Sequence, residues 1–216
     1  METIEQISDE IIQCRLCPRL VEWRERIGSE KRRAFANEEY WARPVPYFGD
    51  PNALHLIVGL APAAHGANRT GRMFTGDRSG DWLFAALFRA GVANQPTSVQ
   101  RGDGLTLSGV LMAATCHCAP PDNKPSLDEL RECNRYLTRI LSNRDWKSVL
   151  CLGSIAWNNV HRTLGIRIEK FGHGAVHQPT NRPRLVASYH PSQQNTFTGK
   201  LTEPMLDAAI AQWLVG

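Results

Sequence analysis

The chain has 216 residues, 42% of them hydrophobic, which excludes general disorder and allows one α/β domain with a sizeable core. Its formal net charge of +4 fits a polyanionic partner without requiring one. No apolar run is long enough to span a bilayer, and the first four residues lack the basic and apolar regions of a signal peptide. We therefore expect a cytoplasmic protein, in which six cysteines are more often metal ligands or core thiols than disulfides.

Helical periodicity and short β-rich runs alternate along the chain. A short amphipathic helix carrying Ile4, Ile7 and Ile11 is expected first, and a second helix follows Pro18. The further elements are a strand over 54–60, a helix over 82–88, a strand over 105–114, a helix begun by the capping box of Ser126, a strand over 148–153, a helix capped by Ser154, a strand over 184–189 and a closing helix over 205–213. This alternation predicts a mostly parallel sheet with helices on both faces.

Two segments that follow expected strands are typical of a ligand pocket. The turn Gly-Leu-Ala-Pro-Ala at 59–63 can bring backbone N–H groups close to a ligand, and His-Pro-Ser at 190–192 can aim an imidazole at it. In such sheets ligands bind beyond the carboxyl ends of the strands, so we expect both turns and residues 116–123 to converge on one crevice. Together they predict a pocket for a flat, polar, uncharged group such as a nucleobase.

Four cysteines have a spacing that is typical of a metal site. Cys14 and Cys17 form a Cys-x2-Cys pair, and Cys118 and Cys133 follow much later with 14 residues between them. Two pairs of thiolates can ligate an iron–sulfur cluster or a structural zinc. The alternative is a set of unrelated core or surface thiols. On spacing alone, Cys116 could replace Cys118 as a ligand.

Five motifs are spread over nearly the whole chain. They are Cys-Arg-Leu-Cys-Pro-Arg-Leu at 14–20, Gly-Leu-Ala-Pro-Ala-Ala-His-Gly at 59–66, Asn-Arg-Thr-Gly-Arg-Met-Phe-Thr-Gly-Asp at 68–77, Cys-Ala-Pro-Pro-Asp-Asn-Lys-Pro at 118–125 and His-Pro-Ser at 190–192. In these motifs and their order, the chain resembles the family-five, or type B, uracil-DNA glycosylases of the uracil-DNA glycosylase superfamily.

The resemblance implies a single domain over residues 1–216, a three-layer α/β/α sandwich with a four-stranded, mostly parallel sheet and an N-terminal cluster-binding segment. It also implies a 4Fe–4S cluster with Cys14, Cys17, Cys118 and Cys133 as ligands. The cysteine before Ala-Pro-Pro-Asp-Asn is the matching position, which favours Cys118 over Cys116. The expected partner is DNA, as a damaged duplex or a single strand, and the expected state is a monomer without membrane contact.

The implied activity is that of a DNA glycosylase that hydrolyses the N-glycosidic bond of uracil and of other deaminated bases, such as hypoxanthine and xanthine, to begin base-excision repair. Such an enzyme must flip the base out of the stack, hold its edge and stabilise the departing anion. The best-known superfamily members have an aspartate at the position of Ala61, and many members have a base-reading asparagine at that of Ala114. Both departures are typical of family five. We therefore expect loose base selection, and, without a placed Schiff-base lysine, a monofunctional enzyme.

The catalytic residues expected here are Asp77, Asn123 and His190. Asp77 precedes a helix, so helix capping is its alternative role, whereas the resemblance favours positioning water or stabilising the sugar cation. Asn123 can read a base edge with its donor and acceptor, and an Asx-type turn is the alternative. His190 would donate to a base carbonyl as the anion forms.

The remaining site predictions concern the base and the DNA backbone. The expected base-binding residues are Gly59, Leu60, Ala61, Pro62 and Ala63, through their backbone, and Phe74, through stacking. The expected DNA-binding residues are His65, Asn68, Arg69, Arg72, Ser192, Gln193 and Phe197, the last as a wedge. Two other functions fit parts of the pattern: a non-catalytic module that binds lesions or abasic DNA with a structural metal cluster, and an electron-transfer protein.

Overall fold

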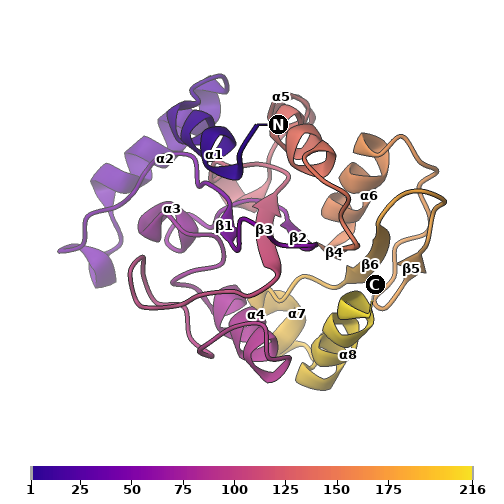
Figure 1. Ribbon diagram of the computed structural model, residues 1–216. Helices are drawn as coiled ribbons and strands as arrows, with labels where there is room; N and C mark the ends of the chain where they lie inside the picture. Colours follow the sequence, from indigo (N-terminus) through magenta and orange to yellow (C-terminus); the bar gives the residue numbers. More distant parts are fainter. Residues whose placement is uncertain (1, 216) are drawn as a thin grey trace.

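The computed structural model describes residues 2–215, so Met1 and Gly216, the ends of the predicted 1–216 domain, lie outside the described residues. A six-stranded sheet crosses the middle of the molecule between two layers of helices (Figure 1). The strands are β1 (Phe48–Gly49), β2 (His55–Gly59), β3 (Val110–Ala114), β4 (Ser148–Leu152), β5 (Val176–His177) and β6 (Arg184–Ser188).

The helices fill the segments between the strands. They are α1 (Ile4–Gln13), α2 (Pro18–Glu30), α3 (Ala67–Thr70), α4 (Arg78–Arg89), α5 (Leu127–Ser142), α6 (Ser154–Thr163), α7 (Gln193–Phe197) and α8 (Glu203–Leu214), with two 3-10 turns at η1 (Arg33–Phe35) and η2 (Pro121–Asn123). Among residues 2–215, no helix is both long and apolar enough to cross a membrane.

The sheet has the strand order β1-β3-β2-β4-β6-β5. Its four central strands pair in parallel, and the two-residue strands β1 and β5 pair antiparallel at the edges. The predicted α/β/α sandwich is confirmed, but the predicted count of four strands omits these two edges. The strand predicted over 105–114 begins only at Val110, because Leu107 pairs with Ala93 and Gly109 takes a left-handed φ of 68°.

Alternate residues of the central strands point to opposite faces of the sheet. Leu56 and Val58 pack in one core with α1, α5 and α6, whereas Ile57 packs in a second core with α4 and α8. Both faces of the sheet are therefore covered, as in other α/β domains with a parallel sheet.

Of the two helix starts predicted from capping residues, that of α5 is confirmed and that of α6 is shifted by one residue. The predicted capping box of α5 is confirmed, since Ser126 accepts from the Glu129 N–H and Glu129 caps the Ser126 N–H in return. The prediction that Ser154 caps α6 is wrong, because the N-cap is Gly153, with a φ of 96° that favours glycine.

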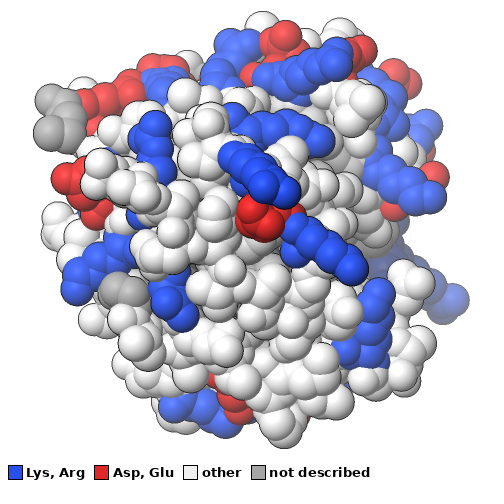
Figure 2. Space-filling model, turned by 90° about the vertical axis from the view of Figure 1, so that its right-hand side faces the viewer, with Lys and Arg blue, Asp and Glu red and all other residues white. Residues whose placement is uncertain are grey.

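The surface reflects the positive net charge. Figure 2 shows the face that lies on the right of Figure 1, where α6, β5 and β6 are found, and Lys and Arg cover more of it than Asp and Glu. The basic side chains are spread over this face instead of forming one compact patch.

Candidate functional site

A cavity of about 820 Å³ opens at the carboxyl ends of the parallel strands. The segments that line it follow β2, β3 and β6, and meet there because parallel strands end at the same edge of the sheet. The structure brings together the three predicted catalytic residues, Asp77, Asn123 and His190. It also places in the lining all the predicted base-binding residues, Gly59, Leu60, Ala61, Pro62, Ala63 and Phe74.

Phe74 lies directly over the end of β2. A Cβ added at Gly59 would come within 2.6 Å of Phe74 Cζ, so only glycine leaves room for the ring. Phe74 itself has a left-handed φ of 51°, a conformation that a non-glycine residue keeps only where its surroundings impose it. Its ring centroid lies 6.0 Å from that of His190, with 32° between the planes. Both rings therefore present flat surfaces to the same cavity.

Asp77 caps α4 and also lines the cavity. Its Oδ1 accepts the Gly80 N–H at 3.1 Å, which caps α4, while its Oδ2 faces Gly66, where any side chain would overlap it. Burial raises the pKa of the Asp77 carboxyl, and the N–H groups of Gly80 and Ser79 oppose that shift. Since one oxygen is enough for the cap, the second remains available in the cavity lining.

Asn123 ends the short turn η2 beyond β3. It has a φ of 55°, and its neighbour Asp122 has a φ of 53°. Its backbone N–H donates to the Pro120 carbonyl at 3.3 Å. Among the described residues, no hydrogen bond engages its side-chain amide, so Asn123 forms no Asx turn, and the residue lines the cavity.

His190 follows β6 and faces Phe74 across the cavity. Its Cβ lies against Gly153, where an added Cβ would be 3.7 Å away. Burial lowers the pKa of His190 to about 4, so the imidazole is neutral at neutral pH and carries one N–H donor. A neutral donor can approach an oxygen without bringing a full positive charge into the site.

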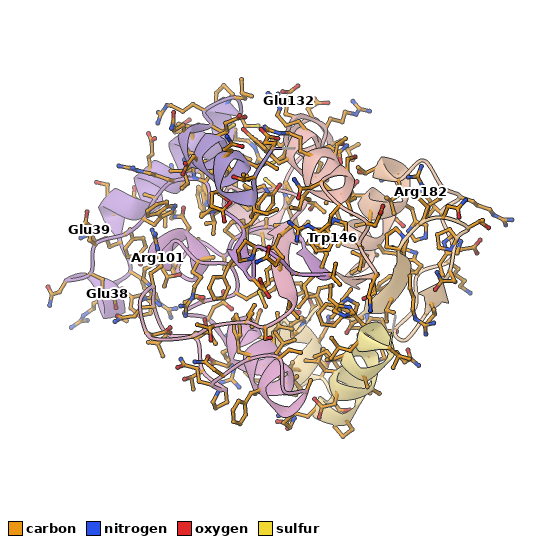
Figure 3. The ribbon with its side chains drawn as sticks, in the orientation of Figure 1. Glu38, Glu39, Arg101, Glu132, Trp146 and Arg182 are labelled. Atoms are coloured by element: carbon orange, nitrogen blue, oxygen red, sulfur yellow. The ribbon has the colours of Figure 1, made fainter. Side chains whose placement is uncertain are left out.

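Three residues predicted to contact DNA lie inside the protein. Asn68 is fully buried and donates to the Arg24 carbonyl at 3.3 Å, and Arg69 is nearly buried. Arg69 pairs with Glu38, which lies at the outer left edge of Figure 3, and also donates to the Gly76 carbonyl at 3.1 Å. In these positions both side chains hold loops together instead of facing an external phosphate.

Arg72 is the third of these residues. Its guanidinium makes a two-pronged ion pair with Asp103, at 2.8 and 2.7 Å, and donates to Thr75 and Ser98. The ion pair lowers the pKa of Asp103. This buried network ties down the loop between α3 and α4, which carries Phe74 and Asp77.

Other predicted DNA contacts lie at or near the opening. His65, Ser192 and Gln193 line the cavity, while Phe197 does not and is 67% exposed. The sequence analysis missed Arg78, which lines the cavity and holds its guanidinium 4.7 Å from the centre of the Phe197 ring. A cation directly after the predicted catalytic Asp77 was the available signal.

The four predicted cysteine ligands share a second cavity. Cys14, Cys17, Cys118 and Cys133 line it together with Cys116. No group of three or more His, Cys, Asp or Glu in residues 2–215 has a ready metal-binding arrangement. Burial raises the pKa of Cys17 to about 11 and that of Cys118 to about 12, so thiolates at these positions would need donors that offset the burial.

Two donors approach these sulfur atoms. Arg24, which is only 2% exposed, places Nη1 2.9 Å from Cys118 Sγ and donates to the Cys14 carbonyl. The His117 N–H donates to Cys133 Sγ at 3.3 Å. Nη2 of the buried Arg24 guanidinium lies 3.9 Å from the Glu25 carboxylate, and its Nε has no hydrogen-bond partner in the described residues. The donor set therefore fits an anionic, sulfur-ligated group.

Comparison with known proteins shows the superfamily to which the chain belongs and, within it, the type. Residues 46–214 match the family model of the uracil DNA glycosylase superfamily, and the chain belongs to that superfamily. It is also similar to curated proteins named type-5 uracil-DNA glycosylase. The relative from Mycobacterium leprae is 50% identical over 95% of this chain and 92% of its own. The relative from Thermus thermophilus is 48% identical over 93% of this chain and 92% of its own. The relative from Pyrobaculum aerophilum is 44% identical over 92% of this chain and 86% of its own. Within the superfamily, the chain belongs to the type-5 uracil-DNA glycosylases.

Proposed function

We propose that this protein is a monofunctional DNA glycosylase that hydrolyses the N-glycosidic bond of uracil in DNA and so begins base-excision repair. The observation that carries the proposal is the convergence of Asp77, Asn123 and His190 with the Phe74 ring in one cavity. Relatives that cover nearly the whole chain are named for this activity.

The cavity supplies what a flipped base requires. The Phe74 ring offers a stacking surface, and the free amide of Asn123 offers one donor group and one acceptor to the base edge. As the glycosidic bond breaks, negative charge develops on the base oxygens. The neutral His190 donates its N–H to one of them and stabilises the leaving anion.

Asp77 acts on the sugar side of the bond. Its Oδ1 remains fixed by the Gly80 N–H, which orients the carboxyl group. Its Oδ2 accepts a hydrogen bond from the attacking water or faces the positive charge that develops on the sugar. The bond to Gly80 at the helix start supports this role, because it fixes the orientation of the carboxyl group.

The lining also predicts loose base selection. Ala61 and Ala114 both line the cavity and bring neither an acid nor an amide to it. A site with fewer polar groups rejects fewer base edges, because it leaves fewer buried donors and acceptors unpaired by a wrong base. We therefore include hypoxanthine and xanthine among the expected substrates.

Cys14, Cys17, Cys118 and Cys133 are proposed to hold a 4Fe–4S cluster. These residues fit the group because they share one cavity with a buried guanidinium. The cluster would supply structural cross-linking, joining the N-terminal helices to the loop after β3 and to α5. This role keeps it out of the chemistry at the base.

DNA would lie across the opening of the cavity. Arg78, Ser192 and Gln193, which line the cavity, would contact backbone phosphates, and the exposed Phe197 would enter the base stack. Because phosphate contacts release counterions, binding should weaken steeply as salt rises.

The test is incubation with duplexes that contain uracil, hypoxanthine or no lesion, followed by cleavage of abasic sites. We expect abasic product from both lesion duplexes and none from the intact one. Tight binding without product would instead support a non-catalytic lesion-binding module. No lysine lines the cavity among the described residues, so borohydride should trap no covalent adduct with DNA. A trapped adduct would contradict the monofunctional mechanism.

A further inference from the structure

The backbone around His190 is held by two side chains from outside the cavity lining. His173, in the loop between α6 and β5, accepts the Tyr189 N–H at 3.2 Å. Asn195, in α7, donates its Nδ2 to the His190 carbonyl at 2.8 Å. Neither side chain lines the cavity. The backbone is therefore held both just before His190, at the Tyr189 N–H, and at the His190 carbonyl.

The bonds of His173 define its tautomer. A backbone N–H can only donate, so Nδ1 must accept from Tyr189, and the ring proton must be on Nε2. That Nε2 lies 3.1 Å from the Met205 carbonyl, which can only accept. Both contacts agree on one neutral tautomer. The ring thus connects the end of β6 to the first turn of α8, which packs beside it (Figure 1).

Aromatic packing supports this connection. The ring centroids of His173 and Tyr189 lie 5.3 Å apart, with 33° between the ring planes. The ring centroids of Phe171 and Tyr189 lie 6.0 Å apart. Since β6 ends at Ser188, its ladder no longer holds Tyr189 and His190. Apart from the Ser188 hydroxyl, which donates to the Tyr189 carbonyl at 2.9 Å, these side chains supply the hydrogen bonds that hold the backbone where the imidazole must be aimed.

We propose that His173 and Asn195 are positioning residues that aim His190 at the base. The inference rests on the proposed function, because it needs His190 to touch the base. A displacement of the imidazole by about 1 Å would be enough to cost on the order of 100-fold in rate. His173 and Asn195 touch neither the base nor the water and act only through His190.

The experiment measures single-turnover uracil excision and duplex affinity for His173→Leu and Asn195→Leu. Each change is made in the wild-type chain and in His190→Ala. In the wild-type chain we expect excision to slow by about 10- to 100-fold while the Kd for the duplex stays within about 2-fold. In the His190→Ala chain, the same changes should slow excision less than about 2-fold, since the group they aim is absent.

Two further variants sharpen the test. His173→Asn keeps an acceptor near the place of Nδ1 and should recover most of the lost rate, even if His173→Leu folds poorly. Asn143→Ala is the matched control, because Asn143 donates to the Glu2 carbonyl far along the chain from the site, and its excision rate should not change. Equal slowing in the wild-type and His190→Ala chains would overturn the inference, as would weaker binding with an unchanged rate.

The outcomes separate this inference from the proposed function. If His190→Ala excises uracil at the wild-type rate, the proposed role of His190 fails. If His190→Ala is slow but His173→Leu and Asn195→Leu behave as wild type, only the positioning role fails.

Discussion

At the scale of single residues, the proposed chemistry depends on two polar groups whose pKa values burial shifts in opposite directions. His190 is neutral because burial lowers its pKa to about 4. Asp77 is a carboxyl group whose pKa burial raises and whose Oδ1 caps a helix. Oriented neutral donors and fixed acceptors stabilise developing charge without reorganising, which is the main advantage of such a site over water.

Asp77→Asn separates the cap from the catalysis. Asparagine is as good an N-cap as aspartate, so thermal denaturation should show a nearly unchanged Tm. The loss of the carboxylate should slow single-turnover uracil excision by about 100-fold or more. Asp77→Ala is the comparison that loses both roles. An Asp77→Asn protein that excises uracil normally would restrict Asp77 to capping.

The depressed pKa of His190 predicts a stability effect. Between about pH 4 and about pH 6.5 the unfolded chain binds a proton at this residue that the folded protein does not. The free energy of unfolding therefore rises with pH through this window, and stability is lost as pH falls. Circular dichroism melts should show the wild-type Tm falling more steeply with acidification than that of His190→Gln. Parallel curves for the two proteins would show that the pKa is not depressed.

At the scale of elements, the ends of the strands create the site. Gly59 ends β2 without a side chain, and the Phe74 ring occupies the space above it. Phe74 in turn is held by a loop that the Arg72–Asp103 ion pair fixes. The proposed stacking surface is therefore formed without a bound base.

Gly59→Ala should disturb this surface. The new Cβ would lie 2.6 Å from Phe74 Cζ, so the ring must move. We expect uracil excision to slow by about 10-fold and the protein to lose about 1–3 kcal/mol of stability from overpacking. Adding Phe74→Leu should restore the Tm but not the excision rate. Failure of the second change to raise the Tm would place the clash elsewhere.

Local sequence pattern predicts some of these elements better than others. The central strands could be predicted because they are short apolar runs, and the start of α5 because its capping box is local. The edge strands β1 and β5 could not, since two residues provide no periodicity. The cavity could be predicted because parallel strands end at one edge.

The buried roles of Asn68, Arg69 and Arg72 could not be predicted. Arg69 meets Glu38 and Arg72 meets Asp103, each 31 residues away along the chain, and only the fold brings them together. A basic residue beside a catalytic loop looks from sequence like a phosphate contact. The ion pairs reveal instead that it supports the loop.

At the scale of the whole molecule, the cavity lined by cysteines lies between the N-terminal helices and the rest of the domain. Cys14 and Cys17 lie before α2, whereas Cys118 and Cys133 lie after β3 and in α5. A shared cluster would cross-link segments that are far apart in sequence, and the free energy of binding it would be part of the free energy of folding.

Cys118→Ser and Cys116→Ser distinguish the two candidate ligands. Both cysteines line the cavity, but only Cys118 is proposed to bind iron. The Cys118→Ser protein should lose most of its iron and its broad visible absorption and should melt at a lower temperature. Cys116→Ser should keep both signals. Iron lost on Cys116→Ser but kept on Cys118→Ser would reverse the assignment, and stoichiometric zinc in a colourless wild-type protein would contradict the cluster.

The most direct test of the whole account is the single-turnover rate of uracil excision by wild-type protein and by His190→Ala, with the DNA saturated by each. We predict abasic product from the wild type. The His190→Ala protein should bind the duplex equally well but excise uracil at least about 100-fold more slowly. Absence of abasic product from the wild type, or an equal rate from the two proteins, would contradict the account.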